Sequence, residues 1–300
     1  MKEPSNPNSS EKRVPRVPIS PEKKGYLVKI EPLRKIIECA IISPYIKGEK
    51  SISLLIAATP ESGKTAALML YSKVKGITIL TDATAYGINQ HIVPRIKSGE
   101  VKTIIIPDLL TPLFKQTKTR RGFIAFLNNL TEEGVGKIVS YAFVQLTDKV
   151  VTANIITAVT KGAIRDARRG WTSMGFLSRF ILFTYSYSES VVYEIMNRYS
   201  EYGLEKKGVK KKVKIKLPRR KVDLKLSKEM ADRINPIARR VGEVYKAYGI
   251  RAKINFRCLL KCLAYRNGRK EVTEEEFREF VKLADYMNLN FSQIGGAIHG

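Results

Sequence analysis

The chain has 300 residues, 44% of them hydrophobic, which is enough for one full-sized domain and a smaller one. Its 54 Lys and Arg against 28 Asp and Glu give a formal net charge of +26, which favours a nucleic-acid partner, although a Lys-rich thermophilic composition would explain part of the excess. No apolar run reaches the roughly 18 residues that span a bilayer, so we expect a cytoplasmic protein without membrane contact.

The first half of the chain begins with a polar segment and then becomes apolar and periodic. Residues 1–25 lack the apolar stretch of a signal peptide and predict a disordered lead-in. Residues 26–48 carry apolar residues at helical spacing, and residues 51–58 form a short run rich in β-branched side chains. The first predicts a helix just before the core, and the second predicts a buried parallel strand.

Strand and helix patterns then alternate. Further strands are predicted at 76–81, 102–108, 152–160 and 180–186, and helices at 65–73 and 122–133. This alternation is typical of an α/β sandwich with a mostly parallel sheet, and we assign residues 26–203 to that core.

The last third of the chain changes character. Residues 205–221 contain ten Lys or Arg and one acid, so 204–225 is predicted to be a basic linker. From residue 226 to 300 the pattern is amphipathic and helical, and Thr273 with Glu276 predicts a capping box. Cys258 and Cys262, four residues apart, are expected to be buried neighbours on one helix face rather than metal ligands.

One short motif carries specific chemistry. Residues 58–65, ATPESGKT, lie between a predicted strand and a predicted helix, where a loop of backbone N–H groups can cradle phosphates. The Lys64 ammonium would reach the β- and γ-phosphates of ATP, and the Thr65 hydroxyl would hold Mg²⁺. The whole loop is expected to bind the nucleotide: Ala58, Thr59, Pro60, Glu61, Ser62, Gly63, Lys64 and Thr65. The motif usually begins with glycine, and alanine at position 58 narrows the allowed backbone angles.

An acid follows a later strand. Asp108 ends the segment IIIPD, where it would bind Mg²⁺ beside the loop. The next residue is Leu109. In many AAA+ ATPases, the superfamily that these motifs resemble, that position holds a catalytic Glu that orients the attacking water. Glu132 or Glu133 could take that role.

From these motifs, residues 30–290 resemble the branch of AAA+ ATPases that includes the MCM helicases, the MoxR and magnesium-chelatase proteins and the enhancer-binding activators. In MCM proteins a helix and an acidic turn lead into a DNA-contacting hairpin, and residues 128–160 look like that passage. Thr160 would then stand in the place of the polar sensor residue. The resemblance implies a three-layer P-loop NTPase sandwich with a small all-helical lid domain at residues 226–300.

The resemblance also assigns two arginines. The segment GFLSRFILF, residues 175–183, is similar to one in which an arginine enters the neighbouring subunit's ATP site, so Arg179 would be that finger. Arg257 lies where lid domains carry a second nucleotide-sensing arginine. A finger acting between subunits implies a homo-oligomer, a ring such as a hexamer or a filament.

Two basic clusters are predicted to line nucleic-acid-binding loops after strands, with Trp171 placed to stack on a base. They contain Lys118, Arg120, Arg121, Lys161, Arg165, Arg168 and Arg169. These features together indicate an ATP-dependent motor on DNA, favoured over RNA, such as a replicative helicase or helicase loader of a virus, plasmid or mobile element. A genome-packaging or transposition ATPase and a non-catalytic, ATP-switched DNA-binding protein are the alternatives.

Overall fold

The computed structural model describes residues 27, 29–113, 117–136, 138–140, 143–145, 150–202, 213, 215–288 and 292–294. The predicted lead-in of residues 1–25 lies outside them.

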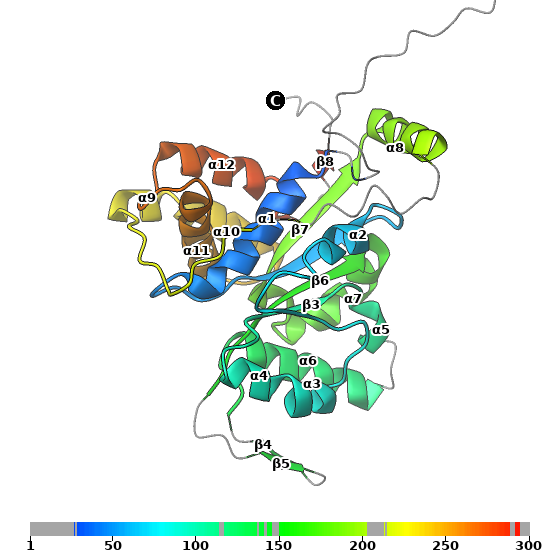
Figure 1. Ribbon diagram of the computed structural model, residues 1–300, viewed down its shortest axis with the longest axis vertical. Coiled ribbons are helices and arrows are strands. Elements are labelled where there is room, and N and C mark those ends of the chain that lie inside the picture. Colours follow the sequence, from blue (N-terminus) through cyan, green and yellow to red (C-terminus); the bar gives the residue numbers. More distant parts are fainter. Residues whose placement is uncertain are drawn as a thin grey trace, which may run out of the picture.

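A parallel sheet forms the centre of the molecule (Figure 1). The five predicted strands are all present, as β1 (Ser53–Ala58), β2 (Ile77–Ile79), β3 (Thr103–Ile106), β6 (Asn154–Thr160) and β7 (Phe180–Tyr187). A sixth, β8 (Ser292–Ile294), joins β7, so the order is β2-β3-β6-β1-β7-β8 with every pair parallel. Every residue of β1 and β3 is buried, as expected for strands covered on both faces. The predicted α/β architecture with a parallel sheet is therefore confirmed.

Helices connect the strands across both faces. They are α1 (Glu31–Ile42), α2 (Lys64–Met69), α3 (Ala85–His91), α4 (Val93–Lys97), α5 (Leu110–Leu113), α6 (Thr117–Thr131), α7 (Lys161–Ser173) and α8 (Glu189–Tyr202). Along the strand order, the connection from β1 to β2 runs toward the β2 edge of the sheet, and the connection from β6 to β7 runs toward the β8 edge. Because such crossovers are right-handed, α2 and α7 lie on opposite faces.

Two helix boundaries differ from the predictions. Helix α1 is shorter than residues 26–48, because Pro32 opens it and a 3₁₀ turn, Ser43–Tyr45, ends it. Helix α6 begins at Thr117 rather than at residue 122, so the basic cluster at 118–121 lies in a helix and not in a loop.

The C-terminal helices α9 (Lys228–Asp232), α10 (Asn235–Val244), α11 (Ile250–Arg266) and α12 (Glu274–Ala284) form a cluster in which α11 packs against α10, α12 and α1 (Figure 1). The predicted capping box at the start of α12 is present, with the Thr273 N–H donating to Glu276 Oε2 at 2.9 Å. The expectation that residues 226–300 are all helical is wrong at β8, which returns to the core sheet. Three residues are too short a run to show strand periodicity.

The two cysteines on α11 behave as expected. Cys258 and Cys262 are both fully buried, with their Sγ atoms 4.0 Å apart. Burial raises the pKa of Cys262, which keeps its thiol protonated. Across the described ranges, no group of three His, Cys, Asp or Glu could hold a metal ion.

The basic linker is only partly described. Val222 pairs with the turn after α1: its N–H donates to Tyr45 O at 2.8 Å, and its carbonyl accepts from Lys47 at 2.8 Å. Lys225, at the end of the segment, instead pairs with the residues before α12: its N–H donates to Lys270 O at 3.1 Å. The segment therefore contacts both the core and the C-terminal helices.

A two-stranded antiparallel ribbon lies where the resemblance placed a hairpin. Strand β4 (Ile138–Ser140) pairs with β5 (Phe143–Gln145). Figure 1 shows the ribbon at one end of the long axis and α8 at the other. The ribbon precedes β6, and so it extends from the amino-terminal edge of the sheet.

Candidate functional site

The motif at residues 58–65 lies at the carboxyl end of the central strand. Ala58 ends β1 and pairs with Thr160 of β6 on one side and Tyr185 of β7 on the other. The connections leaving β1 and β6 diverge to opposite faces, which opens a crevice at this edge, where ligands of open α/β sheets bind. The fold therefore places the loop at the position expected of a ligand site.

Two left-handed residues shape the loop. Glu61 has φ of 60° and Gly63 has φ of 79°. Such alternation turns successive N–H groups toward one side and forms an anion-binding concavity. Glycine is favoured at position 63 by its positive φ, and a Cβ there would also displace the Leu27 Cδ2 methyl, which would lie 2.9 Å away. Ala58, in contrast, has ordinary strand backbone, so the alanine that replaces the motif's first glycine causes no strain.

The Lys64 ammonium is held inside this loop. Its Nζ donates to Thr59 O at 2.6 Å, to Ala58 O at 3.1 Å and to Ser62 Oγ at 3.1 Å. Burial lowers the pKa of Lys64 to about 8, and the nearby negative charge of Asp108 partly opposes that shift. A cation whose hydrogen bonds go to neutral carbonyl and hydroxyl oxygens can exchange them for an anion.

Two tyrosines brace the loop from β7. The hydroxyls of Tyr185 and Tyr187 both donate to the Ser62 carbonyl oxygen, each at 2.9 Å. Burial raises the pKa of Tyr187 to about 12 and that of Tyr185 further, so both phenols stay protonated as donors. We did not predict this brace. Its sequence signal is the pair of aromatic residues two positions apart on one face of a strand.

Asp108 lies at the same edge of the sheet, two strands away from β1. It is exposed, and its Oδ1 accepts from the Leu110 N–H at 2.9 Å. The following Leu109 is fully buried, and its N–H donates to Ala158 O of β6 at 2.9 Å. A side chain at position 109 therefore points into the core, and even a glutamate there would not face the loop.

Thr160 stands between the loop and Asp108, since β6 separates β1 from β3. Its Oγ1 accepts from the Ala163 N–H at 3.2 Å and caps α7. The hydroxyl oxygen therefore accepts the capping hydrogen bond, and the hydroxyl hydrogen can still be donated to a ligand.

Glu132 and Glu133 lie at the opposite edge. They follow α6 and precede β6, and Glu132 contacts Arg179 at the start of β7. Strand β1 is about 16 Å long at the usual rise per residue, so these carboxylates are on the wrong side to assist the same chain's loop. The prediction that one of them supplies the catalytic base is therefore left only for a site in another copy of the chain.

Arg179 is enclosed in an ionic cluster at that edge. Its Nε lies 2.8 Å from Glu132 Oε2, and its guanidinium contacts Glu133 Oε1 at 3.2 Å. Lys50 and Arg251 also pair with Glu132, at 3.0 and 2.7 Å. Burial would raise the pKa of Glu132, but the hydrogen bonds from Arg251 and Lys50 outweigh it and lower that pKa overall.

Arg257 is not near the loop. It projects from the middle of α11 to Glu49, at 3.2 Å, in the turn before β1. That turn is at the amino-terminal edge of the sheet. Arg257 therefore lies away from the same chain's loop, because α11 packs along α1 with this face toward the turn, and its role in nucleotide binding stays a prediction.

The basic residues form helical rather than loop surfaces. Helix α7 begins directly after β6, because Thr160 caps it. Six of the residues predicted to contact nucleic acid are exposed side chains on α6 and α7: Arg120, Arg121, Lys161, Arg165, Arg168 and Arg169. The backbone of Lys118 lies in the first turn of α6, and its side chain is outside the described residues. Trp171 is only 5% exposed and packs edge-on against Phe176 at 5.4 Å, so it is not available to stack on a base.

Comparison with models of known protein families and with curated protein sequences finds no match. Among the described helices, none combines the length and the apolar character needed to cross a bilayer.

Proposed function

We propose that this protein is an AAA+ P-loop ATPase that acts on DNA, as a replicative helicase or a helicase loader. The observation that carries the proposal is the Lys64 ammonium, held by three neutral oxygens inside a left-handed loop at the carboxyl end of the central strand. An ammonium in such a loop is suited to bind the β- and γ-phosphates of a nucleotide.

The neighbouring oxygen donors suit Mg²⁺. Thr65 is exposed in the first turn of α2, and Asp108 is exposed at the same edge of the sheet. A hydroxyl and a carboxylate are ligands that this ion accepts. When bound with ATP, the ion would neutralise phosphate charge, while Lys64 leaves the loop carbonyls for the phosphates.

The position of Arg179 supports a role between subunits. It lies at the edge of the sheet opposite its own loop, so it can reach a nucleotide only in another copy. In the isolated chain Glu132 and Glu133 neutralise it. We infer that a neighbour's triphosphate must replace at least one of these carboxylates, which makes assembly and ATP binding interdependent.

The exposed cations on α6 and α7 support contact with nucleic acid. Both helices begin at the carboxyl edge of the sheet, so their basic first turns lie on the side of the nucleotide loop. A conformational change of the nucleotide loop on ATP binding would therefore occur close to the basic residues proposed to contact nucleic acid.

The structure also favours one alternative, a nucleotide-switched assembly protein that does not hydrolyse ATP. Leu109 is buried at the position of the usual base, and Glu132 is at the far edge. Glu61, within the loop, is an exposed carboxylate, but it does not follow β3.

Steady-state hydrolysis of ATP, measured with and without single-stranded DNA, separates the two functions. A motor gives turnover that DNA stimulates and that Lys64→Ala abolishes. Tight ATP binding without turnover, with or without DNA, would support the switch. Absence of both binding and turnover would refute each of them.

A further inference from the structure

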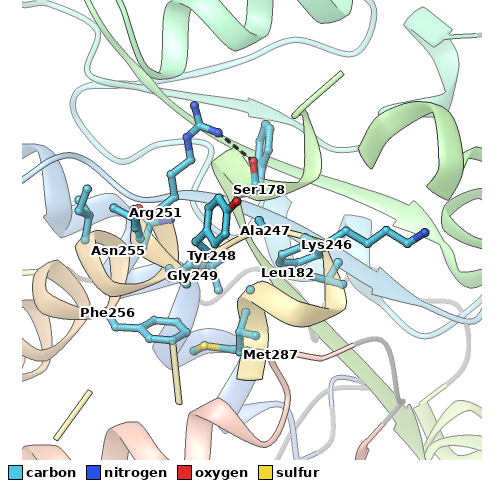
Figure 2. A pocket seen from close by; sticks show the side chains of 18 of the residues that line it. Ser178, Leu182, Lys246, Ala247, Tyr248, Gly249, Arg251, Asn255, Phe256 and Met287 are labelled. Atoms are coloured by element: carbon cyan, nitrogen blue, oxygen red, sulfur yellow. Dashed lines mark hydrogen bonds between the residues drawn. The ribbon is translucent and has the colours of Figure 1, made fainter. Parts of the chain in front are cut away.

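An apolar cavity of about 540 Å³ lies at the amino end of β7, opposite the edge that carries the nucleotide loop. A cavity of this size can hold several side chains. Its walls come from the start of β7, from α10, from the turn before α11 and from α11, and include Phe180, Leu182, Val241, Tyr245, Phe256 and Met287. Figure 2 labels Leu182, Phe256 and Met287 among them.

The cavity is shaped by the backbone itself. Gly242 of α10 packs directly on the turn before α11, where a Cβ at position 242 would lie 2.4 Å from Gly249 N. Gly249 has φ of 83°, and its own Cβ would lie 2.4 Å from Ala238 O. Neither position tolerates a side chain, so the turn that forms one wall is fixed before anything binds.

The mouth of the cavity combines exposed apolar side chains with one exposed lysine. Tyr248 is 93% exposed and Ile254 is 37% exposed. Lys246 is exposed on the same turn, and Figure 2 shows its side chain extending away from the apolar wall. At another side of the mouth, Arg251 donates to Ser178 Oγ at 3.2 Å and is neutralised by Glu132, at 2.7 Å, which also lines the cavity. Lys246 therefore supplies the excess positive charge. An occupant should therefore combine apolar side chains with negative charge.

Helix α8 has these properties. Tyr193 and Met196, three positions apart on one face, are 63% and 58% exposed. Glu189 lies one turn before Tyr193 on the same face and is exposed. The sequence of α8 contains three acids and one base, although the chain as a whole has 54 bases and 28 acids.

We propose that α8 of one copy docks in this cavity of a second copy, with Tyr193 and Met196 in the apolar space and Glu189 facing Lys246. The proposal deepens the oligomeric part of the proposed function and rests on it. Helix α8 follows the carboxyl end of β7, and the cavity lies at its amino end, so the two surfaces are at opposite ends of one strand. A contact between different surfaces is head-to-tail and produces a ring or a filament.

The contact also has a consequence for Arg179. Ser178 lines the cavity, and Arg179 follows it. Helix α8 lies at the same edge of the sheet as the nucleotide loop of its own copy. When it docks in the cavity of a second copy, that loop would approach the second copy's Arg179.

Sedimentation of single and mixed variants tests the contact. Met196→Lys blocks only the helix, and Ile254→Lys blocks only the cavity, so each alone should sediment as a monomer of 33.9 kDa. Mixed in equal amounts, they should form a heterodimer of twice that mass, because one intact helix remains for one intact cavity. Val281→Lys, which replaces an exposed apolar residue of α12 on neither surface, should assemble like the wild type.

Charge exchange provides a second test that does not depend on the apolar variants folding. Glu189→Lys and Lys246→Glu should each weaken assembly at low salt, and the double variant should restore it. A monomeric wild type, unchanged assembly of both apolar variants, or a mixture that remains monomeric would overturn the proposal. ATP binding by the monomeric Met196→Lys variant is measured separately. Its loss in every protein would refute the proposed function and leave the sedimentation result standing.

Discussion

The charge of Lys64 should make ATP binding depend on pH. Burial lowers the pKa of this ammonium to about 8, so about 90% of the free protein carries the charge at pH 7 and about 10% at pH 9. The phosphate groups titrate near pH 6 and stay ionised throughout this range. Because only the charged amine pairs with phosphate, ATP affinity should fall about tenfold between pH 7 and pH 9.

Isothermal titration calorimetry checks both the affinity and the proton. Above pH 8 the complex should take up close to one proton, seen as a binding enthalpy that depends on the buffer's ionisation enthalpy. Lys64→Arg is the matched control, since a guanidinium stays charged and should remove the pH dependence. An affinity that is flat from pH 7 to pH 9 in the wild type, or the same slope in Lys64→Arg, would refute the reasoning.

Three further expectations follow from the described contacts. Gly63→Ala should weaken ATP binding at least tenfold in a folded protein, because φ of 79° strains any residue with a Cβ. Ala58→Gly should bind like the wild type, and equal loss in both would contradict this. Glu132→Gln should lower the free energy of unfolding in urea by about 1–3 kcal/mol, because three cations lose a shared carboxylate. Glu133 is more exposed, so Glu133→Gln should lower it by less than about 0.5 kcal/mol. A larger effect at Glu133 than at Glu132 would contradict the arrangement of the cluster. Reversing Arg165 and Arg169 to Glu should flatten the log–log salt dependence of DNA affinity by about 1.4 to 1.8, while Arg239→Glu on α10 should leave it unchanged. An unchanged slope in the α7 variant would exclude that helix as a binding surface.

The sheet could be predicted because its strands are buried on both faces. Continuous apolar runs such as SLLIAA and NIITAVT are typical of strands in a parallel sheet that helices cover on both faces. Strand β8 could not be predicted, because its three residues acquire their conformation only by pairing with β7.

The centre of the candidate site was predictable for a related reason. The lysine and glycine of the loop have fixed positions relative to the strand before them, and local geometry decides where they point. Leu109 shows the limit of this reasoning, since its identity was evident in the sequence but its burial against β6 was not.

The residues assigned by resemblance depend on distant parts of the chain. Arg257 faces Glu49, 208 positions earlier, and Arg179 is held by Glu132 and Glu133. A local sequence pattern cannot predict ion-pair partners that lie so far away along the chain. Trp171 is similar: its position after a basic run suggested exposure, but it faces Phe176 and the core side of α7.

The most direct test is equilibrium binding of ATP to the wild type and to Lys64→Ala at pH 7, with thermal unfolding measured on both. We expect the wild type to bind ATP and Lys64→Ala to lose that binding while unfolding at a similar temperature. Equal ATP affinity in two equally folded proteins would contradict the assignment of residues 58–65 as the nucleotide site.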